Sequence, residues 1–124
     1  MDIVLHEREM ELMEVLWERG AATAAEVREA IPDELAYNTI LTILRRLEQK
    51  GYVGHTEEGR AHRYHPLVER EQARRSALQR MLDRVFGGSP ELLLTQLVSQ
   101  RKLSEEEVRR LRQLLREQLP KGDS

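Results

Sequence analysis

Apolar residues recur at helical spacing in three stretches of the first fifty residues. Residues 7–19 carry them at every third or fourth position, and Gly20 follows as a typical helix stop. A capping-box pattern at residues 23–26 predicts a second helix, which Pro32 ends. The third stretch predicts a helix over residues 37–50. The apolar positions expected to face the core are Met10, Met13, Leu16, Trp17, Val27, Ala30, Ile31, Ile40, Ile43, Leu44 and Leu47.

After Gly51 the pattern becomes typical of strands. Residues 52–56 and 60–65 are rich in strand-forming residues, and residues 57–59 between them supply a turn with a glycine. These stretches predict a β-hairpin. Successive side chains on a strand point to opposite faces, so we expect Tyr64 to face the core and the arginine before it to face away.

Helical spacing returns in the second half of the chain. A helix is expected from Leu67 to Phe86, and a double glycine ends it. A serine followed by a proline starts the next helix at residue 89, and a second capping box at residues 104–107 starts the last one. We expect residues 120–124 to be a tail.

Three short helices followed by a hairpin are the element order of a winged helix, a variant of the helix-turn-helix. We therefore predict a mainly α-helical chain with a small β-hairpin. Residues 1–66 are expected to form a winged helix-turn-helix DNA-binding domain, and residues 67–124 an α-helical dimerisation domain. In such a domain a short helix braces a recognition helix whose amino-terminal end enters the major groove.

Residues 90–119 contain nine leucines on two short helices, more than the winged-helix domain can cover. Apolar stripes of this kind are commonly buried against a second copy of the chain in a two-fold dimer. The alternative is an intramolecular helical bundle. We favour the dimer because two winged helices on adjacent half-sites bury enough DNA surface for useful affinity. The residues expected at the dimer interface are Leu78, Met81, Leu82, Val85, Leu93, Leu97, Val108, Leu111 and Leu115.

Charge is unevenly distributed along the chain, although the net charge is only −2 over 124 residues. Residues 1–35 carry −7, whereas residues 36–75 carry +3 and three of the four histidines. Of the 20 basic residues, 17 are arginine, whose forked guanidinium suits phosphate. The basic middle segment favours an anionic partner. A general bias towards arginine codons explains the arginine count equally well.

Composition and motifs exclude several classes of protein. The chain has no cysteine, which rules out disulfides, thiol catalysis and cysteine-ligated metal sites. Its longest apolar run, residues 92–94, is too short to span a membrane, and no signal-peptide pattern follows Met1. No hydrolase, nucleotide-loop or zinc-protease motif is present. We expect a soluble, cytoplasmic protein that is not an enzyme, needs no cofactor and does not associate directly with membranes.

Seven polar side chains of the third helix and the hairpin are candidates for DNA contact. The first turns of a recognition helix reach base edges, where asparagine pairs with adenine and threonine bonds a base or touches a thymine methyl group. Arginines one turn later and on the hairpin are candidates for phosphate contacts, and Arg46 for a base contact. The candidates are Asn38, Thr39, Thr42, Arg45, Arg46, Arg60 and Arg63.

Each of these candidates has a purely structural alternative. Asn38 or Thr39 can cap the third helix instead of contacting a base. The arginines of this helix can belong to a solvated face, on which Arg45 pairs with Glu48 or Gln49.

Three histidines in the hairpin region, His55, His62 and His65, raise the question of a metal site. His62 and His65 are separated by an odd number of residues, so on one strand they point to opposite faces. Since the chain also lacks cysteine and a carboxylate cluster of matching spacing, we interpret them as solvated histidines and predict no metal site.

Several segments of this sequence resemble the penicillinase repressor (BlaI/MecI/CopY) family. They are residues 11–17, 39–53, 63–64, 87–89 and 103–108, and the Thr-x-x-Thr…Arg-Leu…Lys-Gly run that starts at Thr39 is the most specific. The resemblance extends over nearly the whole chain. It implies a homodimeric winged-helix repressor that binds two-fold operator DNA in the promoters it silences.

The resemblance also implies how such a repressor is released. Members that respond to β-lactams leave DNA when a membrane sensor-protease or another protease cuts their carboxy-terminal region and breaks the dimer. Where the best-known of them have an Asn-Phe bond, this sequence has Gln96-Leu97, which makes Gln96 and Leu97 the candidate cleavage residues. Copper-responsive members sense metal through carboxy-terminal cysteines, which this chain lacks.

Two hypotheses about function follow. The first is a homodimeric DNA-binding transcriptional repressor that a signal of the β-lactam type or another kind releases through proteolysis. The second is a protein-interaction module in which the winged helix binds no specific DNA, since a fold alone does not fix a function. The exposed face expected on the third helix favours the first, because a protein-docking face more often presents aromatic residues or methionine.

Overall fold

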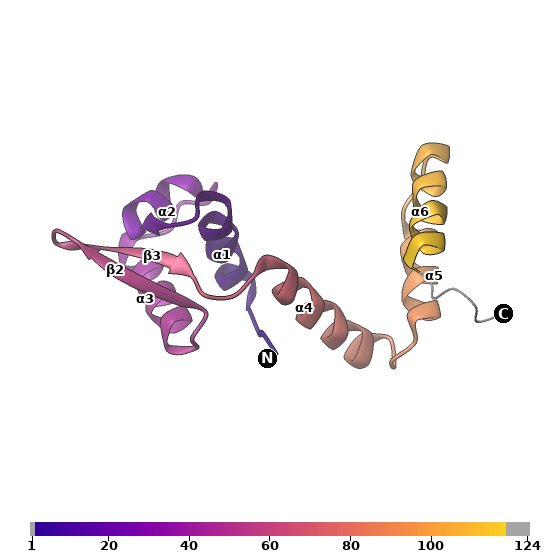
Figure 1. Ribbon diagram of the computed structural model, residues 1–124, viewed down its shortest axis with the longest axis horizontal. Helices are drawn as coiled ribbons and strands as arrows, with labels where there is room; N and C mark the ends of the chain where they lie inside the picture. Colours follow the sequence, from indigo (N-terminus) through magenta and orange to yellow (C-terminus); the bar gives the residue numbers. More distant parts are fainter. Residues whose placement is uncertain (1, 119–124) are drawn as a thin grey trace. The chain divides into compact units, whose positions relative to one another are not determined.

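The computed structural model describes residues 2–118, which fold into six helices and three strands (Figure 1). In chain order the elements are α1 (Glu7–Arg19), β1 (Ala22–Thr23), α2 (Ala24–Ala30), α3 (Tyr37–Gln49), β2 (Val53–Glu58), β3 (Ala61–Pro66), α4 (Arg70–Val85), α5 (Pro90–Gln100) and α6 (Glu105–Gln118). This order confirms the predicted fold class, with strand β1 as an addition. Leu119 and the expected tail at residues 120–124 lie outside the described residues.

The caps predicted from the sequence are present at three helix starts. At α2, Thr23 Oγ1 accepts a hydrogen bond from Glu26 N at 3.2 Å, and Thr23 N donates to Glu26 Oε1 at 3.0 Å. Ser89 Oγ accepts from the third residue of α5, and Ser104 and Glu107 form the reciprocal pair at the start of α6. Each of these three helices therefore begins where a side chain satisfies otherwise unpaired backbone N–H groups.

Three helix boundaries differ from the predictions, one of them the end of α4, which falls at Val85 rather than Phe86. Helix α4 begins at Arg70 rather than Leu67, because Leu67 N donates to the Tyr52 carbonyl at 2.8 Å and keeps the chain extended. Helix α3 ends at Gln49, one residue early, and Gly51 follows with a φ of +83°, a conformation that glycine adopts without strain.

The three strands form one antiparallel sheet in the order β1-β3-β2. Strand β1 was not predicted, since two residues are too few to show an alternating pattern. It pairs Ala22 with Tyr64 and Thr23 with Arg63, and so joins the start of α2 to the hairpin.

The predicted turn at residues 57–59 is wrong in its position. Strand β2 continues through Glu58, which pairs with Ala61, so the turn consists of Gly59 and Arg60. Gly59 has a φ of +63°, as the first residue of a tight two-residue hairpin turn requires. The two glutamates form strand because cross-strand pairing overrides their weak preference for it.

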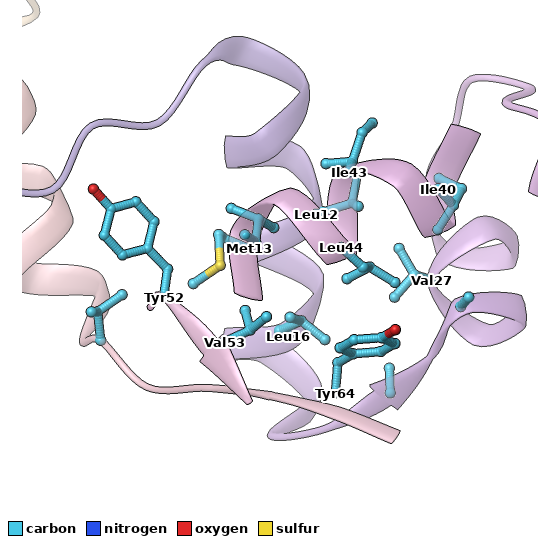
Figure 2. Close-up of a cluster of buried hydrophobic side chains, with 14 of the residues drawn as sticks. Leu12, Met13, Leu16, Val27, Ile40, Ile43, Leu44, Tyr52, Val53 and Tyr64 are labelled. Atoms are coloured by element: carbon cyan, nitrogen blue, oxygen red, sulfur yellow. The ribbon is translucent and has the colours of Figure 1, made fainter. Parts of the chain in front are cut away.

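The core lies between helices α1, α2 and α3 and one face of the sheet (Figure 2). The predicted apolar faces supply most of it, and Tyr64 is 2% exposed, which confirms its expected direction. Fully or almost fully buried side chains include Leu12, Met13, Leu16, Val27, Ile40, Leu44, Leu47 and Val53. Trp17 is only partly buried, and its Nε1 donates to the Val68 carbonyl at 2.9 Å.

The chain divides into two compact units that meet between Arg80 and Met81. The first unit extends beyond the boundary expected after residue 66, because the first part of α4 packs on it. Ala73 is buried, Ser76 Oγ accepts from Ile3 N at 3.0 Å, and Arg80 Nη1 donates to the Ile3 carbonyl at 2.7 Å.

The second unit contains the end of α4 with α5 and α6, and neither α5 nor α6 has a buried residue in the described chain. Most of their apolar residues are exposed; Leu97 and Leu115, for example, are each 51% exposed. No helix among residues 2–118 combines the length and the apolar character that crossing a membrane requires.

Candidate nucleic-acid interface

Helix α3 presents one polar face and one buried face. Its buried residues fall at Ile40, Ile43, Leu44 and Leu47, where they pack into the core. The side chains on the other side of the helix are exposed and include five of the DNA-binding candidates: Asn38, Thr39, Thr42, Arg45 and Arg46. Packing of the apolar stripe therefore forces these five candidates outward together.

Neither Asn38 nor Thr39 caps α3, so the capping alternative is wrong. The N-cap is Ala36, whose carbonyl accepts from Thr39 N at 3.0 Å. Both side chains lie on the first turn of the helix and are exposed. Thr42 Oγ1 donates to the Asn38 carbonyl at 2.9 Å, which leaves the hydroxyl oxygen as an acceptor and the methyl group as a contact surface.

The side chains of the two arginines of α3 have no hydrogen-bond or ion-pair partner within residues 2–118. The pairing of Arg45 with Glu48, which was the structural alternative to a DNA contact, is absent there, because Glu48 Oε2 contacts His55 Nδ1 at 2.5 Å. The guanidinium groups of Arg45 and Arg46 are therefore available to an external anion.

A hollow of about 290 Å³ lies between α3, the start of α2 and the hairpin. Arg45 from α3 and Arg60 from the hairpin turn line it together, with Leu41 and His62. Arg60 is exposed and lacks a polar partner in the described part of the chain. The hollow is at the lower limit of small-molecule pockets, ~300–1,000 Å³, so two arginines beside it suit a surface phosphate better than an enclosed ligand.

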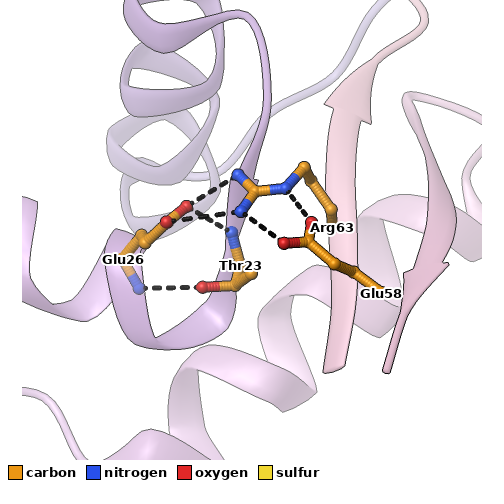
Figure 3. A network of polar contacts seen from close by, with 4 residues as sticks. All are labelled: Thr23, Glu26, Glu58 and Arg63. Atoms are coloured by element: carbon orange, nitrogen blue, oxygen red, sulfur yellow. Dashed lines mark hydrogen bonds and ion pairs between the residues drawn. The ribbon is translucent and has the colours of Figure 1, made fainter. Parts of the chain in front are cut away.

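Arg63 differs from the other candidates because two carboxylates hold its guanidinium (Figure 3). Its Nη1 donates to Glu26 Oε1 at 2.9 Å, and its Nε donates to Glu58 Oε2 at 2.5 Å. These hydrogen bonds hold the pKa values of Glu26 and Glu58 below their usual range and raise the pKa of Arg63. We call Arg63, Glu26, Glu58 and Thr23 the Arg63 network.

The hairpin histidines are organised without forming a metal-ligand cluster. The His55 and His62 rings stack with centroids 4.1 Å apart and planes 9° from parallel. Within residues 2–118, no group of three or more His, Cys, Asp or Glu side chains is placed to hold a metal ion. His55 is bonded to Glu48, so its ring is fixed between α3 and the hairpin.

The candidate cleavage residues lie in the middle of α5. Gln96 and Leu97 are both exposed, and Gln96 Oε1 accepts from Gln100 Nε2 at 3.4 Å, one turn further along the helix. Among the predicted interface residues, Leu78, Met81, Val85, Leu97, Leu111 and Leu115 are exposed, and Leu82, Leu93 and Val108 are partly exposed.

Two ion pairs that join distant segments of the first unit illustrate what the sequence analysis did not predict. Glu26 was recognised for its cap, but its contact with Arg63, 37 positions away, has no local signal. The same is true of Glu9, which is 1% exposed and accepts from Lys50 Nζ at 2.8 Å.

Comparison with known proteins relates this architecture to a family of regulators. The model of the penicillinase repressor family matches residues 5–117. The chain is 28% identical over 115 residues to the penicillinase repressor of Bacillus licheniformis, which covers 91% of this chain and 90% of that protein. It is 27% identical over 109 residues to the methicillin resistance regulatory protein MecI of Staphylococcus aureus, covering 86% and 89% of the two chains.

Solved structures agree with this relationship. The solution structure of the DNA-binding domain of the repressor BlaI matches with a TM-score of 0.53 and 28% identity, over 58% of this chain and 90% of that domain. A MarR mutant from E. coli in complex with operator DNA matches with a TM-score of 0.54, over 94% of this chain and 76% of that one. At 17% identity the second match shows a shared fold alone.

Proposed function

Because the chain belongs to the penicillinase repressor family, we propose that it is a DNA-binding transcriptional repressor that acts as a homodimer on a two-fold operator. The observation that carries this proposal is the exposed polar face of α3 beside Arg60. We also propose a cytoplasmic location, since a repressor has to meet its operator DNA.

The side chains of α3 divide by the contacts they suit. Asn38, Thr39 and Thr42 lie on the first two turns, where a recognition helix reads base edges in the major groove. Arg45 and Arg60 come from two elements to one hollow, which suits phosphate contacts that position the protein without reading sequence. Arg46 lies on the same exposed side and is assigned to phosphate or to one base.

Uncovered apolar residues along α4 and in the second unit support dimerisation. Leu78, Met81 and Val85 follow one another at helical spacing on α4 and are 53%, 49% and 67% exposed. Leu111 and Leu115 continue the pattern on α6. A second copy of the chain would remove these stripes from water and place two winged helices on adjacent half-sites.

Release by proteolysis is the finer part of the proposal. Cutting the bond between Gln96 and Leu97 would divide α5 and separate part of the apolar surface from the DNA-binding unit. A sensor-protease or another releasing protease is the partner that this step requires. Both residues are exposed but helical, so α5 has to unwind locally before a protease can bind the bond in extended form.

The test is binding to a panel of two-fold operators, measured by fluorescence anisotropy across a salt series. We expect tight, selective and salt-dependent binding that Thr39→Ala/Thr42→Ala weakens at least tenfold, which requires that the two lost contacts together contribute about 1.4 kcal/mol or more. The matched control is Thr95→Ala on α5, because Thr95 Oγ1 donates to the Glu91 carbonyl at 2.8 Å just as Thr42 does to Asn38. The control should bind like the wild type.

Two outcomes would contradict the proposal. Equal loss in the control would show that the threonines act on helix stability rather than on DNA. If no duplex binds above the nonspecific level, about 10⁻⁴–10⁻⁶ M, even after selection from genomic fragments, the repressor function is wrong. The protein-interaction module would then be the better explanation of the fold.

A further inference from the structure

We propose that Arg63 is a positioning residue that holds the hairpin against the start of α2, so that Arg60 meets a DNA phosphate, and that Arg63 itself makes no DNA contact. This inference rests on the proposed function and replaces the earlier assignment of Arg63 as a DNA-binding residue. It concerns the first unit alone.

The geometry of the Arg63 network explains why this arginine is held firmly. Glu58 binds the Arg63 guanidinium in bidentate form, with Nε at 2.5 Å from Oε2 and Nη2 at 3.4 Å from Oε1. Glu26 does the same from the other side, with Nη1 at 2.9 Å from Oε1 and Nη2 at 3.4 Å from Oε2. One planar guanidinium therefore joins two carboxylates, a task for which arginine is better suited than lysine.

The same contacts join three elements of the winged helix. Glu58 is on β2, Arg63 on β3 and Glu26 on α2 (Figure 3). Glu26 Oε1 also accepts from Thr23 N at 3.0 Å, and Thr23 pairs with Arg63 in the β1–β3 ladder. Side-chain and backbone contacts thus fix the hairpin at Arg63, and the turn that carries Arg60 projects beyond this fixed point.

Charge argues against a direct DNA contact by Arg63. One positive group shared between two carboxylates leaves the network with a net charge of −1, which repels a phosphate. Arg63 is also only 30% exposed. Arg60 is fully available in comparison, since no described side chain neutralises it. Arg60 therefore makes the phosphate contact, and the Arg63 network determines the position of Arg60.

The experiment measures operator affinity against salt for the wild type, Arg60→Gln, Arg63→Gln and the double variant. Removing one phosphate contact lowers the slope of log K against log salt by about one. We expect each single variant to lower it by about one and the double variant to lower it no further, because loss of Arg63 already removes the Arg60 contact. The affinity losses should be equally non-additive.

Three further variants test the proposed cause. Arg63→Lys keeps the charge but cannot bind both carboxylates with a planar fork, so we expect it to behave like Arg63→Gln. In a Glu26→Gln/Glu58→Gln background, adding Arg60→Gln should no longer lower the salt slope or the operator affinity. The matched control is Arg75→Gln, which removes an arginine from an exposed pair with Glu71 on α4 and should leave affinity and slope unchanged. Melting curves verify that every variant is folded.

The contrary outcomes are distinct. A double variant whose slope falls by about two, together with near-normal binding by Arg63→Lys, would make Arg63 a phosphate contact. A second contrary outcome is that Arg63→Gln leaves the salt slope unchanged while adding Arg60→Gln to it still lowers the slope by about one. The role of Arg63 would then be purely structural. An unchanged slope in Arg60→Gln itself would overturn this inference while the α3 threonine variants still tested the repressor function. If the wild type binds no duplex, both proposals fail.

Discussion

The buried carboxylate of Glu9 connects the start of α1 to Lys50 at the end of α3. Its carboxylate accepts from Lys50 Nζ at 2.8 Å and from His6 N at 2.9 Å, while its other oxygen has no partner among the described residues. Burial raises the pKa of Glu9, but the hydrogen bonds from Lys50 and the His6 amide outweigh it and bring the pKa below its usual value. The carboxylate therefore stays charged and depends on Lys50.

The corresponding prediction concerns Lys50→Met, which leaves the Glu9 carboxylate buried with one amide donor. We expect the free energy of unfolding at pH 7 to fall by about 1.5–3 kcal/mol, the range for a hydrogen bond to a charged group. Urea denaturation measures it. Glu9→Met/Lys50→Met should recover much of the loss, because it removes the unpaired charge as well. The idea is wrong if the double variant is less stable than Lys50→Met.

Elements α2, β2 and β3 are joined by the ion pairs of Glu26 and Glu58 with Arg63. Because these ion pairs require charged carboxylates, we expect their contribution to stability to depend on pH. The pKa values of Glu26 and Glu58 are lowered by hydrogen bonds from Arg63, and the Thr23 amide lowers that of Glu26 further. A lowered pKa in the folded state means that the stabilisation is complete above the unfolded value of about 4.3. It is lost as the pH falls through the lower, folded-state values.

We therefore predict that acid removes the advantage of the wild type over Glu26→Gln/Glu58→Gln. The melting temperature of the wild type should be the higher one at pH 7, and the difference should shrink as the pH falls below about 4.3, because protonated glutamate resembles glutamine. Thermal unfolding followed by circular dichroism measures this. A difference that stays constant over the whole range would show that the carboxylates do not act through their charge.

At the scale of the whole molecule, the chain has a well-packed first unit and a second unit with uncovered apolar faces. This contrast is the reason that we propose a homodimer. Exposed leucines on α5 and α6 cost free energy in water, about 25 cal/mol for each Å² of apolar surface that a partner could cover. A two-fold dimer is the commonest way to cover such faces.

The prediction at this scale is that Leu111→Glu converts a dimer to monomers and weakens operator binding, because the two half-sites are no longer bound together. Sedimentation velocity gives the oligomeric state. Gln118→Glu is the matched control, since it adds the same charge to α6 at an exposed position outside the predicted interface residues. A wild type that sediments as a monomer at micromolar concentration would contradict the prediction.

Local spacing along the chain was sufficient to predict the six helices, the hairpin and the winged-helix fold class. Apolar periodicity and capping residues act over three or four positions, so their signals lie within short segments. The same periodicity predicted the exposed face of α3, because burial of Ile40, Ile43, Leu44 and Leu47 leaves only one side of the helix outward.

Contacts between distant segments emerged only from the fold. Strand β1 exists because β3 pairs with it, and its two residues carry no pattern of their own. The sequence predicted Arg63 to be a surface arginine that contacts DNA. In the folded chain, Glu26 and Glu58 both bind its guanidinium group. Arg45 and Arg60 likewise meet at one hollow because α3 packs beside the hairpin. Each of these contacts depends on how separate elements pack against one another. The spacing of residues along one segment does not specify that packing.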